Sequence, residues 1–169
     1  GESGSGKSVT ARIVLGLLQS LRSARISGEA RFQGHDVNAM SETERRKLRG
    51  TDISMIFQDP TSALNPVFTI GDQFHEVLKR RDRAISRSSA NARASEALAE
   101  VSIRDPARVL ASYAFQLSGG MNQRVMIAMA LANAPALLLA DEPGTALDVT
   151  VQDQTLRLMR DLVARQKTS

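Results

Sequence analysis

Apolar side chains recur at helical spacing over much of this chain. Near its start they lie four residues apart, at Val9, Ile13, Leu17 and Leu21. This repeat places them on one face of a helix and predicts a helix over residues 9–21. Further along, Ser41-Glu42-Thr43-Glu44 has the pattern of a capping box and predicts a second helix that runs to about Arg49.

Three shorter segments have the composition of strands. Ala30 and Phe32 alternate with polar neighbours before Gly34, which predicts a short strand followed by a turn. Residues 53–57 are rich in apolar side chains, and residues 136–140 form an apolar run. Each stretch is followed by polar residues, and they predict two more strands. The second of these stretches is apolar throughout and predicts a buried strand.

The middle of the chain is predicted to be helical. Residues 70–103 are rich in Ala, Arg and Glu and predict a helical stretch, and Asp105-Pro106 predicts the start of another helix. A long helix is predicted from Gly119, and an amphipathic helix from about Val151. We interpret this pattern as a helical subdomain, residues 65–124, inserted into an α/β core formed by residues 1–64 and 125–169.

Composition and charge change this picture little. The formal net charge is +4, and basic residues cluster at 45–49 and 79–87. No aromatic side chain lies among them to stack on bases, so solvated helix faces are favoured over a nucleic-acid or lipid-headgroup surface. The chain has no cysteine, which excludes disulfides, thiol catalysis and cysteine-based metal sites within these residues. The longest apolar run, residues 125–132, is too short to cross a bilayer.

The stretch "GESGSGKS" has the pattern of a phosphate-binding loop, G-x-x-x-x-G-K-[ST]. Its glycines allow a tight turn with inward N–H groups, and the following helix adds its positive end. In this interpretation Lys7 meets the terminal phosphates of a nucleotide and Ser8 binds Mg²⁺. The alternative is a flexible Gly/Ser linker. The predicted contacts are Gly1, Glu2, Ser3, Gly4, Ser5, Gly6, Lys7 and Ser8.

Two predicted strands end in side chains suited to nucleotide chemistry. Asp141 and Glu142 follow the 136–140 strand, at the carboxyl end where open α/β sheets bind ligands. Asp141 suits a Mg²⁺ partner through water, and Glu142 suits a general base that takes a proton from the attacking water. Gln58 follows the 53–57 strand and can orient a water and touch Mg²⁺ without adding charge. The alternative for the two carboxylates is an acidic turn after a core strand.

The stretch "LSGGM" places two glycines at a predicted helix start. Gly119 and Gly120 expose N–H groups beside the positive helix end, and Ser118 adds a hydroxyl donor. This predicts a second phosphate-binding end, with an ordinary glycine-assisted helix start as the alternative. A single nucleotide rarely needs two phosphate-binding helix ends from the same chain. Two such ends are expected where two chains share two nucleotides.

In their order and spacing these stretches resemble one family, the ATPase subunits of ABC transporters. Residues 1–8 match its Walker A motif, Gln58 its Q-loop and residues 137–142 its Walker B motif. The signature is matched by Leu117, Ser118, Gly119, Gly120 and Met121, and the D-loop by Ala146, Leu147 and Asp148. The stretches "MIFQDPTSALNPVFTIGDQ", "LSGGMNQRVMIAMAL" and "TALDVTVQ" resemble the importer branch that moves dipeptides, oligopeptides, nickel or glutathione.

The resemblance implies an α/β P-loop NTPase fold, with a RecA-like mixed sheet and an inserted helical subdomain. It implies ATP and Mg²⁺, with Ser8, Gln58 and Asp141 at the metal and with Glu142 and Gln58 as catalytic residues. It also implies a head-to-tail ATPase dimer, in which ATP lies between Walker A of one subunit and the signature of the other. The implied partners are membrane permease subunits and, indirectly, a solute-binding protein, without nucleic acid, at the cytoplasmic face of the inner membrane.

The chain departs from the family pattern in several places. Gly144 stands where the family often has Thr, and Ala114-Phe115 stands where it usually has Pro-His. The family's adenine-stacking aromatic lies upstream of Walker A, and its switch histidine lies beyond the last predicted helix. His35, in a predicted turn, and His75, on a predicted helix, both precede Walker B, so neither matches that histidine. We therefore expect an internal fragment, truncated at both ends and inactive alone.

Other ABC ATPase classes are the alternatives to an importer subunit. Non-transport ATPases of DNA repair or chromosome structure carry a long coiled coil between Walker A and the signature, and no sustained heptad pattern occurs between Lys7 and Ser118. A translation factor with paired ATPase domains is disfavoured by the importer-like stretch around Gln58.

Overall fold

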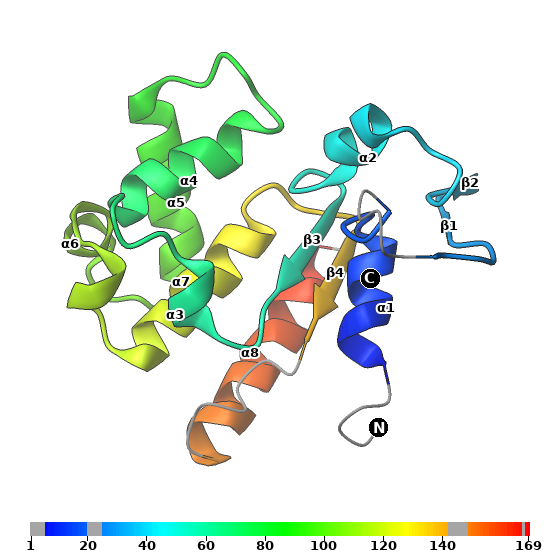
Figure 1. Ribbon diagram of the computed structural model, residues 1–169. Helices are drawn as coiled ribbons and strands as arrows, with labels where there is room; N and C mark the ends of the chain where they lie inside the picture. Colours follow the sequence, from blue (N-terminus) through cyan, green and yellow to red (C-terminus); the bar gives the residue numbers. More distant parts are fainter. Residues whose placement is uncertain (1–5, 20–24, 142–148, 167) are drawn as a thin grey trace. The chain divides into compact units, whose positions relative to one another are not determined.

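The computed structural model describes residues 6–19, 25–141, 149–166 and 168–169 and contains two compact units, Gly1–Arg49 and Gly50–Ser169 (Figure 1). Polar contacts around α2 connect the first unit, and an apolar core connects the second. The predicted boundaries of the helical subdomain, at 64/65 and 124/125, stay a prediction. Over the described part of the chain, no helix combines the length and hydropathy that crossing a membrane requires.

The first unit contains two helices and a small hairpin. Its elements are α1 (Lys7–Val14), β1 (Arg31–Phe32), β2 (His35–Asp36) and α2 (Glu42–Leu48). The two strands pair antiparallel, with Phe32 opposite His35. Gln33 and Gly34 join them and both have positive φ, 49° and 84°, the conformation of a tight hairpin turn. The predicted strand and turn are confirmed, although His35 lies in the second strand and not in the turn.

Helix α1 is shorter than the apolar repeat predicts. It begins at Lys7 and ends at Val14, so the prediction of a helix as far as Leu21 is wrong. Gly16 follows in the left-handed region, with φ of +68°. The N–H of Gly16 donates to the Ile13 carbonyl and that of Leu17 to the Arg12 carbonyl, which is the Schellman pattern of a helix end. The local glycine therefore overrides the apolar repeat.

Helix α2 begins at the capping box that the sequence predicts. The Ser41 hydroxyl accepts from the Glu44 N–H at 3.3 Å, and the Glu44 carboxylate accepts from the Ser41 N–H at 2.7 Å. One residue of this helix contradicts the expectation of a solvated basic face. Arg45 is only 8% exposed, because its guanidinium pairs with Glu42 and donates to the Met40 carbonyl. The arginines of the second basic cluster, at 80, 81, 83 and 87, are exposed as expected.

The second unit is a parallel strand pair joined by a helical crossover. Strand β3 (Ile53–Ile56) pairs in parallel with β4 (Leu137–Ala140), and Ile56 lies opposite Ala140. The elements between and after them are α3 (Pro60–Ala63), α4 (Ile70–Lys79), α5 (Arg87–Glu100), α6 (Pro106–Ala111), the 3₁₀ turn η1 (Ala114–Gln116), α7 (Gly119–Leu131) and α8 (Val149–Gln166). In Figure 1, α4, α5 and α6 gather together, and α7 packs against both this group and β3.

The predicted helical stretch over 70–103 is two helices. Residues 80–86 interrupt it, because polar side chains there bind the backbone that a continuous helix would use. The Asp82 carboxylate accepts from the Ala84 N–H at 3.0 Å, and the Ser86 hydroxyl accepts from the Ser89 N–H at 3.1 Å to cap α5. The predicted helix after Asp105 is confirmed as α6, whose N-terminus is capped by that aspartate.

The core of the second unit lies around α7. Its fully buried members include Ile56 of β3, Phe74 of α4, Leu98 of α5, and Val125 and Ile127 of α7. All four residues of β3 are buried. The prediction that β4 is buried is wrong, since its leucines are half-buried and Ala140 is exposed. At the start of β4, the Leu138 N–H donates to the Ser169 carbonyl at 2.8 Å, and the Ser169 N–H donates to the Ala136 carbonyl at 2.9 Å.

Candidate functional site

The described end of the phosphate loop leads directly into α1. Gly6 has φ of +82°, a conformation that favours glycine, and it occupies the N-cap position of the helix. Lys7 and Ser8 begin the helix and lie at its positive end. Lys7 is exposed and Ser8 is half-buried. The predicted contacts Gly1, Glu2, Ser3, Gly4 and Ser5 lie outside the described residues.

In the second unit, two predicted site residues come to the same edge of the sheet. Strands β3 and β4 end side by side, and the Asp141 N–H donates to the Ile56 carbonyl at 3.0 Å. Gln58 follows β3 on this edge and is exposed, whereas Asp141 is only 9% exposed. The carboxyl edge of parallel strands is where α/β sheets bind ligands. The predicted neighbour Glu142 lies outside the described residues, as do the D-loop residues Ala146, Leu147 and Asp148.

The oxygen donors at this edge fit Mg²⁺. Mg²⁺ is usually bound by one or two carboxylates together with substrate phosphates and water. Asp141 supplies a carboxylate at the strand end and Gln58 a neutral amide oxygen. Within the described residues, no group of three or more His, Asp or Glu side chains could hold a metal without such help. A carboxylate and an amide oxygen at one strand edge are donors that fit Mg²⁺ bound together with phosphates and water.

The "LSGGM" stretch forms the N-terminus of α7. The Ser118 hydroxyl accepts from the Met121 N–H at 3.3 Å and caps the helix. Ser118 and Gly119 are exposed, and space for a Cβ is open at both Gly119 and Gly120. This helix end is thus unobstructed within the described residues, while Leu117 and Met121 are half-buried against the core of the unit.

Two polar side chains of α7 are buried, and the sequence pattern did not single them out. Asn122 is 2% exposed, and its amide donates to the Ala114 carbonyl at 3.0 Å. This bond ties the turn before Ser118 to the helix after it. Gln123 is 1% exposed among the apolar residues of the core. The only available signal was the placement of two amides on the buried side of a helix that packs on several neighbours.

A scan against protein-family models matches residues 1–145 to the model described as ABC transporter. The chain belongs to the ABC transporter family. It is 50% identical over 169 residues to the probable peptide ABC transporter ATP-binding protein y4tR of Sinorhizobium fredii, covering all of this chain and 50% of that protein. It is 52% identical over 162 residues to the peptidoglycan transport ATP-binding protein YejF of Agrobacterium fabrum, covering 96% and 30%.

A third relative and a solved structure give the same result. The dipeptide transport ATP-binding protein DppD of Escherichia coli is 49% identical over 163 residues, which are 96% of this chain and 49% of that protein. The ATP-binding cassette MJ0796, solved as a dimer in a post-hydrolysis state with ADP and Pi, aligns with a TM-score of 0.81 at 32% identity. The alignment covers 99% of this chain and 69% of that one. The predicted P-loop NTPase fold is confirmed, and the chain spans about half the length, or less, of these curated relatives.

The two departures before the signature have visible structural consequences in this ABC cassette. Ala114, where the family usually has Pro, is 4% exposed and belongs to the apolar core. Phe115, where it usually has His, is 72% exposed, and its ring stacks on that of Tyr113 at 5.5 Å between centroids. The two histidines stand in ordinary positions, since His35 is exposed on the hairpin and His75 lies 3.4 Å from the Ile85 carbonyl.

Proposed function

We propose that the full-length protein binds and hydrolyses ATP to power the import of a peptide-like solute. The observation that carries this proposal is the strand pair β3–β4, which brings Gln58 and Asp141 to one carboxyl edge in a chain of the ABC transporter family. The relatives named for peptide, dipeptide and peptidoglycan transport support the solute class. Nickel and glutathione are the alternative solutes, because the importer branch that the sequence resembles also moves them.

The residue roles follow from charge and position. Lys7 binds the terminal phosphates together with the N–H groups of the loop from Gly1 to Ser8. Ser8, Gln58 and Asp141 would hold Mg²⁺, which neutralises charge on the phosphates when it is bound. Glu142 accepts a proton from the attacking water.

The open N-terminus of α7 supports a dimeric arrangement. Ser118, Gly119 and Gly120 would bind the γ-phosphate of ATP held by Walker A of a second subunit, with Leu117 and Met121 anchoring the turn. The dimeric state of the related cassette MJ0796 is consistent with this arrangement. A second ATPase subunit, membrane permease subunits and, indirectly, a solute-binding protein are the proposed partners. The proposed location is the cytoplasmic face of the inner membrane.

Two variants of the full-length protein test this function. Lys7→Ala removes a cation that meets the terminal phosphates, so titration with labelled ATP should show loss of tight binding. Glu142→Gln should keep ATP binding but slow phosphate release by ~10²–10⁴-fold, the usual effect of losing a general base. Glu96→Gln, the same chemical change on the exposed face of α5, is the control and should leave the rate unchanged. Full turnover by Glu142→Gln would remove that residue from the role.

A further inference from the structure

Side chains from residues 38–49, the segment that includes α2, contact the C-terminal end of α1. The last carbonyls of a helix have no partners within it and carry its negative end. The Schellman pattern satisfies those of Arg12 and Ile13. The carbonyls of Leu15, the C-cap residue, and of Gly16, just beyond it, accept hydrogen bonds from Nη1 of Arg49 at 3.4 and 3.1 Å. A guanidinium thus lies on the negative end of this helix, where a cation is stabilising.

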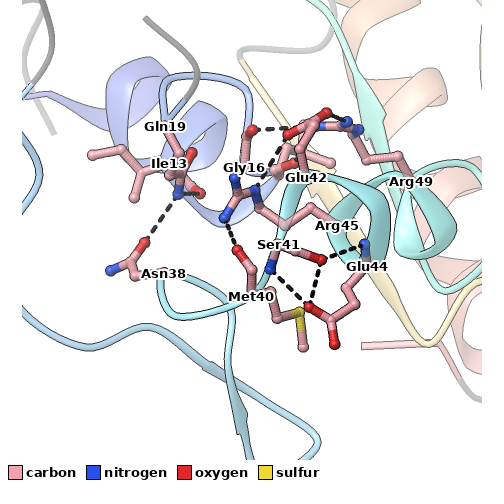
Figure 2. A network of polar contacts seen from close by, with 11 residues as sticks. Ile13, Gly16, Gln19, Asn38, Met40, Ser41, Glu42, Glu44, Arg45 and Arg49 are labelled. Carbon is pink, nitrogen blue, oxygen red and sulfur yellow. Dashed lines mark hydrogen bonds and ion pairs between the residues drawn. The ribbon is translucent and has the colours of Figure 1, made fainter. Parts of the chain in front are cut away.

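Glu42 holds that guanidinium in place. Its Oε1 pairs with Nη2 of Arg49, and its Oε2 lies 3.4 Å from Nε of Arg45 (Figure 2). Arg45 in turn donates to the Met40 carbonyl and is almost fully buried. The hydrogen bond from Arg49 keeps the pKa of Glu42 below its ordinary value, so the carboxylate stays ionised. One carboxylate that binds two arginines leaves Arg49 little rotational freedom.

The same helix end also touches this segment at two further points. A Cβ on Gly16 would collide with Cδ of Arg45, so the glycine backbone lies directly against that side chain. The Gln19 amide nitrogen lies 2.9 Å from both the Ile13 carbonyl and Oδ1 of Asn38 (Figure 2). Several independent contacts therefore fix the end of α1. Among these residues, Arg49 is the one that binds the Leu15 and Gly16 carbonyls.

Helix α1 is short enough for its two ends to move together. Its eight residues span about 12 Å, and hydrogen bonds run along its whole length. Its first turn carries Lys7 and Ser8, the predicted contacts to phosphate and metal. A displacement of the C-terminal end by ~1 Å would move these side chains by a similar amount, and misplacements of that size can lower catalysis by ~10²-fold.

We propose that Arg49, held by Glu42, is a positioning residue for phosphate binding. It fixes the C-terminal end of α1 and thereby the place of Lys7 and Ser8 at the opposite end. This inference rests on the proposed nucleotide-binding function. Arg49 acts through the helix and touches no nucleotide itself, which distinguishes it from the residues of the phosphate loop.

The test compares three variants of the full-length protein. Arg49→Ala removes the anchor. Arg49→Lys keeps the cation but replaces the two guanidinium nitrogens, one on the carbonyls and one on Glu42, with a single ammonium. Arg31→Ala is the matched control, since it removes an arginine–carboxylate pair of 2.7 Å with Glu29 on the exposed hairpin. Each variant is measured for hydrogen exchange of the α1 amides, for ATP affinity and turnover, and for melting temperature.

Arg49→Ala should raise exchange of the α1 amides by about tenfold, because a charged hydrogen bond to the helix end is lost. It should lower kcat/KM for ATP by roughly 10–10²-fold at a temperature where circular dichroism shows the protein folded. Arg49→Lys should recover about half of this loss on a logarithmic scale, and Arg31→Ala should match the wild type.

Two results would overturn the proposal. Unchanged α1 exchange in Arg49→Ala would show that Arg49 does not anchor the helix, whether or not the protein hydrolyses ATP. Faster exchange with wild-type affinity and turnover would show a role in stability alone. If the wild type itself fails to bind ATP in a Lys7-dependent manner, the proposed nucleotide function is wrong, and the exchange result still decides whether Arg49 anchors α1.

Discussion

At the scale of single residues, Gly16 meets two separate requirements. Its φ of +68° favours glycine, and its Cα lies against the side chain of Arg45. Gly34 shares the first requirement, with φ of +84°, but space for a Cβ is open there. The pair therefore separates the conformational cost of a side chain from the cost of displacing Arg45.

We expect Gly16→Ala to destabilise the protein more than Gly34→Ala. The left-handed conformation alone costs about 1–2 kcal/mol in either variant. Overpacking against Arg45 should add roughly 1–3 kcal/mol at position 16. Urea unfolding of the full-length variants measures both changes in the free energy of unfolding. Equal losses in the two variants would mean that Arg45 moves aside without cost.

The site residues show what the sequence could predict at this scale. Lys7, Gln58 and Asp141 were found because each stands at a fixed offset from a glycine loop or a strand end, which are local patterns. The burial of Arg45 was not predictable in this way. It depends on Gly16, which is distant in sequence, and on a carboxylate that is shared with Arg49.

At the scale of elements, helix starts were predicted better than helix ends. The capping box at Ser41 and the N-cap at Ser118 are hydrogen bonds between residues three apart in sequence. Such local bonds can be predicted from the sequence pattern. The end of α1 depends on one glycine, and the break between α4 and α5 on the caps at Asp82 and Ser86. Contacts between elements were not predictable, such as Asn133, whose amide donates at 2.8 Å to carbonyls of both Gly50 and Val77.

The carboxylates at the helix starts predict a dependence on pH. Hydrogen bonds from the Ser41 side chain and backbone lower the pKa of Glu44, and hydrogen bonds from Thr69 and then Arg87 lower that of Asp72. A lowered pKa in the folded state means that the unfolded chain binds more protons, so stability is present above the ordinary carboxyl pKa and is lost as the pH falls through the lowered value.

We therefore expect the free energy of unfolding to fall as the pH drops below 4.5, the ordinary value for Glu44. Glu44→Gln should reduce the steepness of this loss, because its amide does not titrate. Glu100→Gln, at the exposed end of α5, is the control for removing one carboxylate elsewhere. Urea titrations between pH 3 and pH 6 give the slopes, and identical slopes for Glu44→Gln and the wild type would contradict the expectation.

At the scale of the whole molecule, the order of motifs predicted the fold class. A phosphate loop before a helix and two strand ends with polar side chains are the parts of a P-loop NTPase, and the comparisons confirm it. The half-burial of β4 was not predictable from its apolar run, because burial depends on how much chain covers the strand. A run of leucines shows that these side chains favour burial, but it does not show how much of their surface is covered.

The last prediction follows from the proposed head-to-tail dimer and concerns complementation. Ser118→Arg should impair hydrolysis without preventing a subunit from binding ATP, because a bulky side chain would keep the partner's γ-phosphate from the open end of α7. Lys7→Ala should fail to bind ATP tightly. When the two variants of the full-length protein are mixed, one composite site of each mixed dimer carries both lesions and the other carries neither. The mixture should therefore occlude ATP, measured by retention of labelled nucleotide, where each variant alone does not. A mixture that occludes no more ATP than the separate variants would show that Walker A and the signature of different subunits do not share a site.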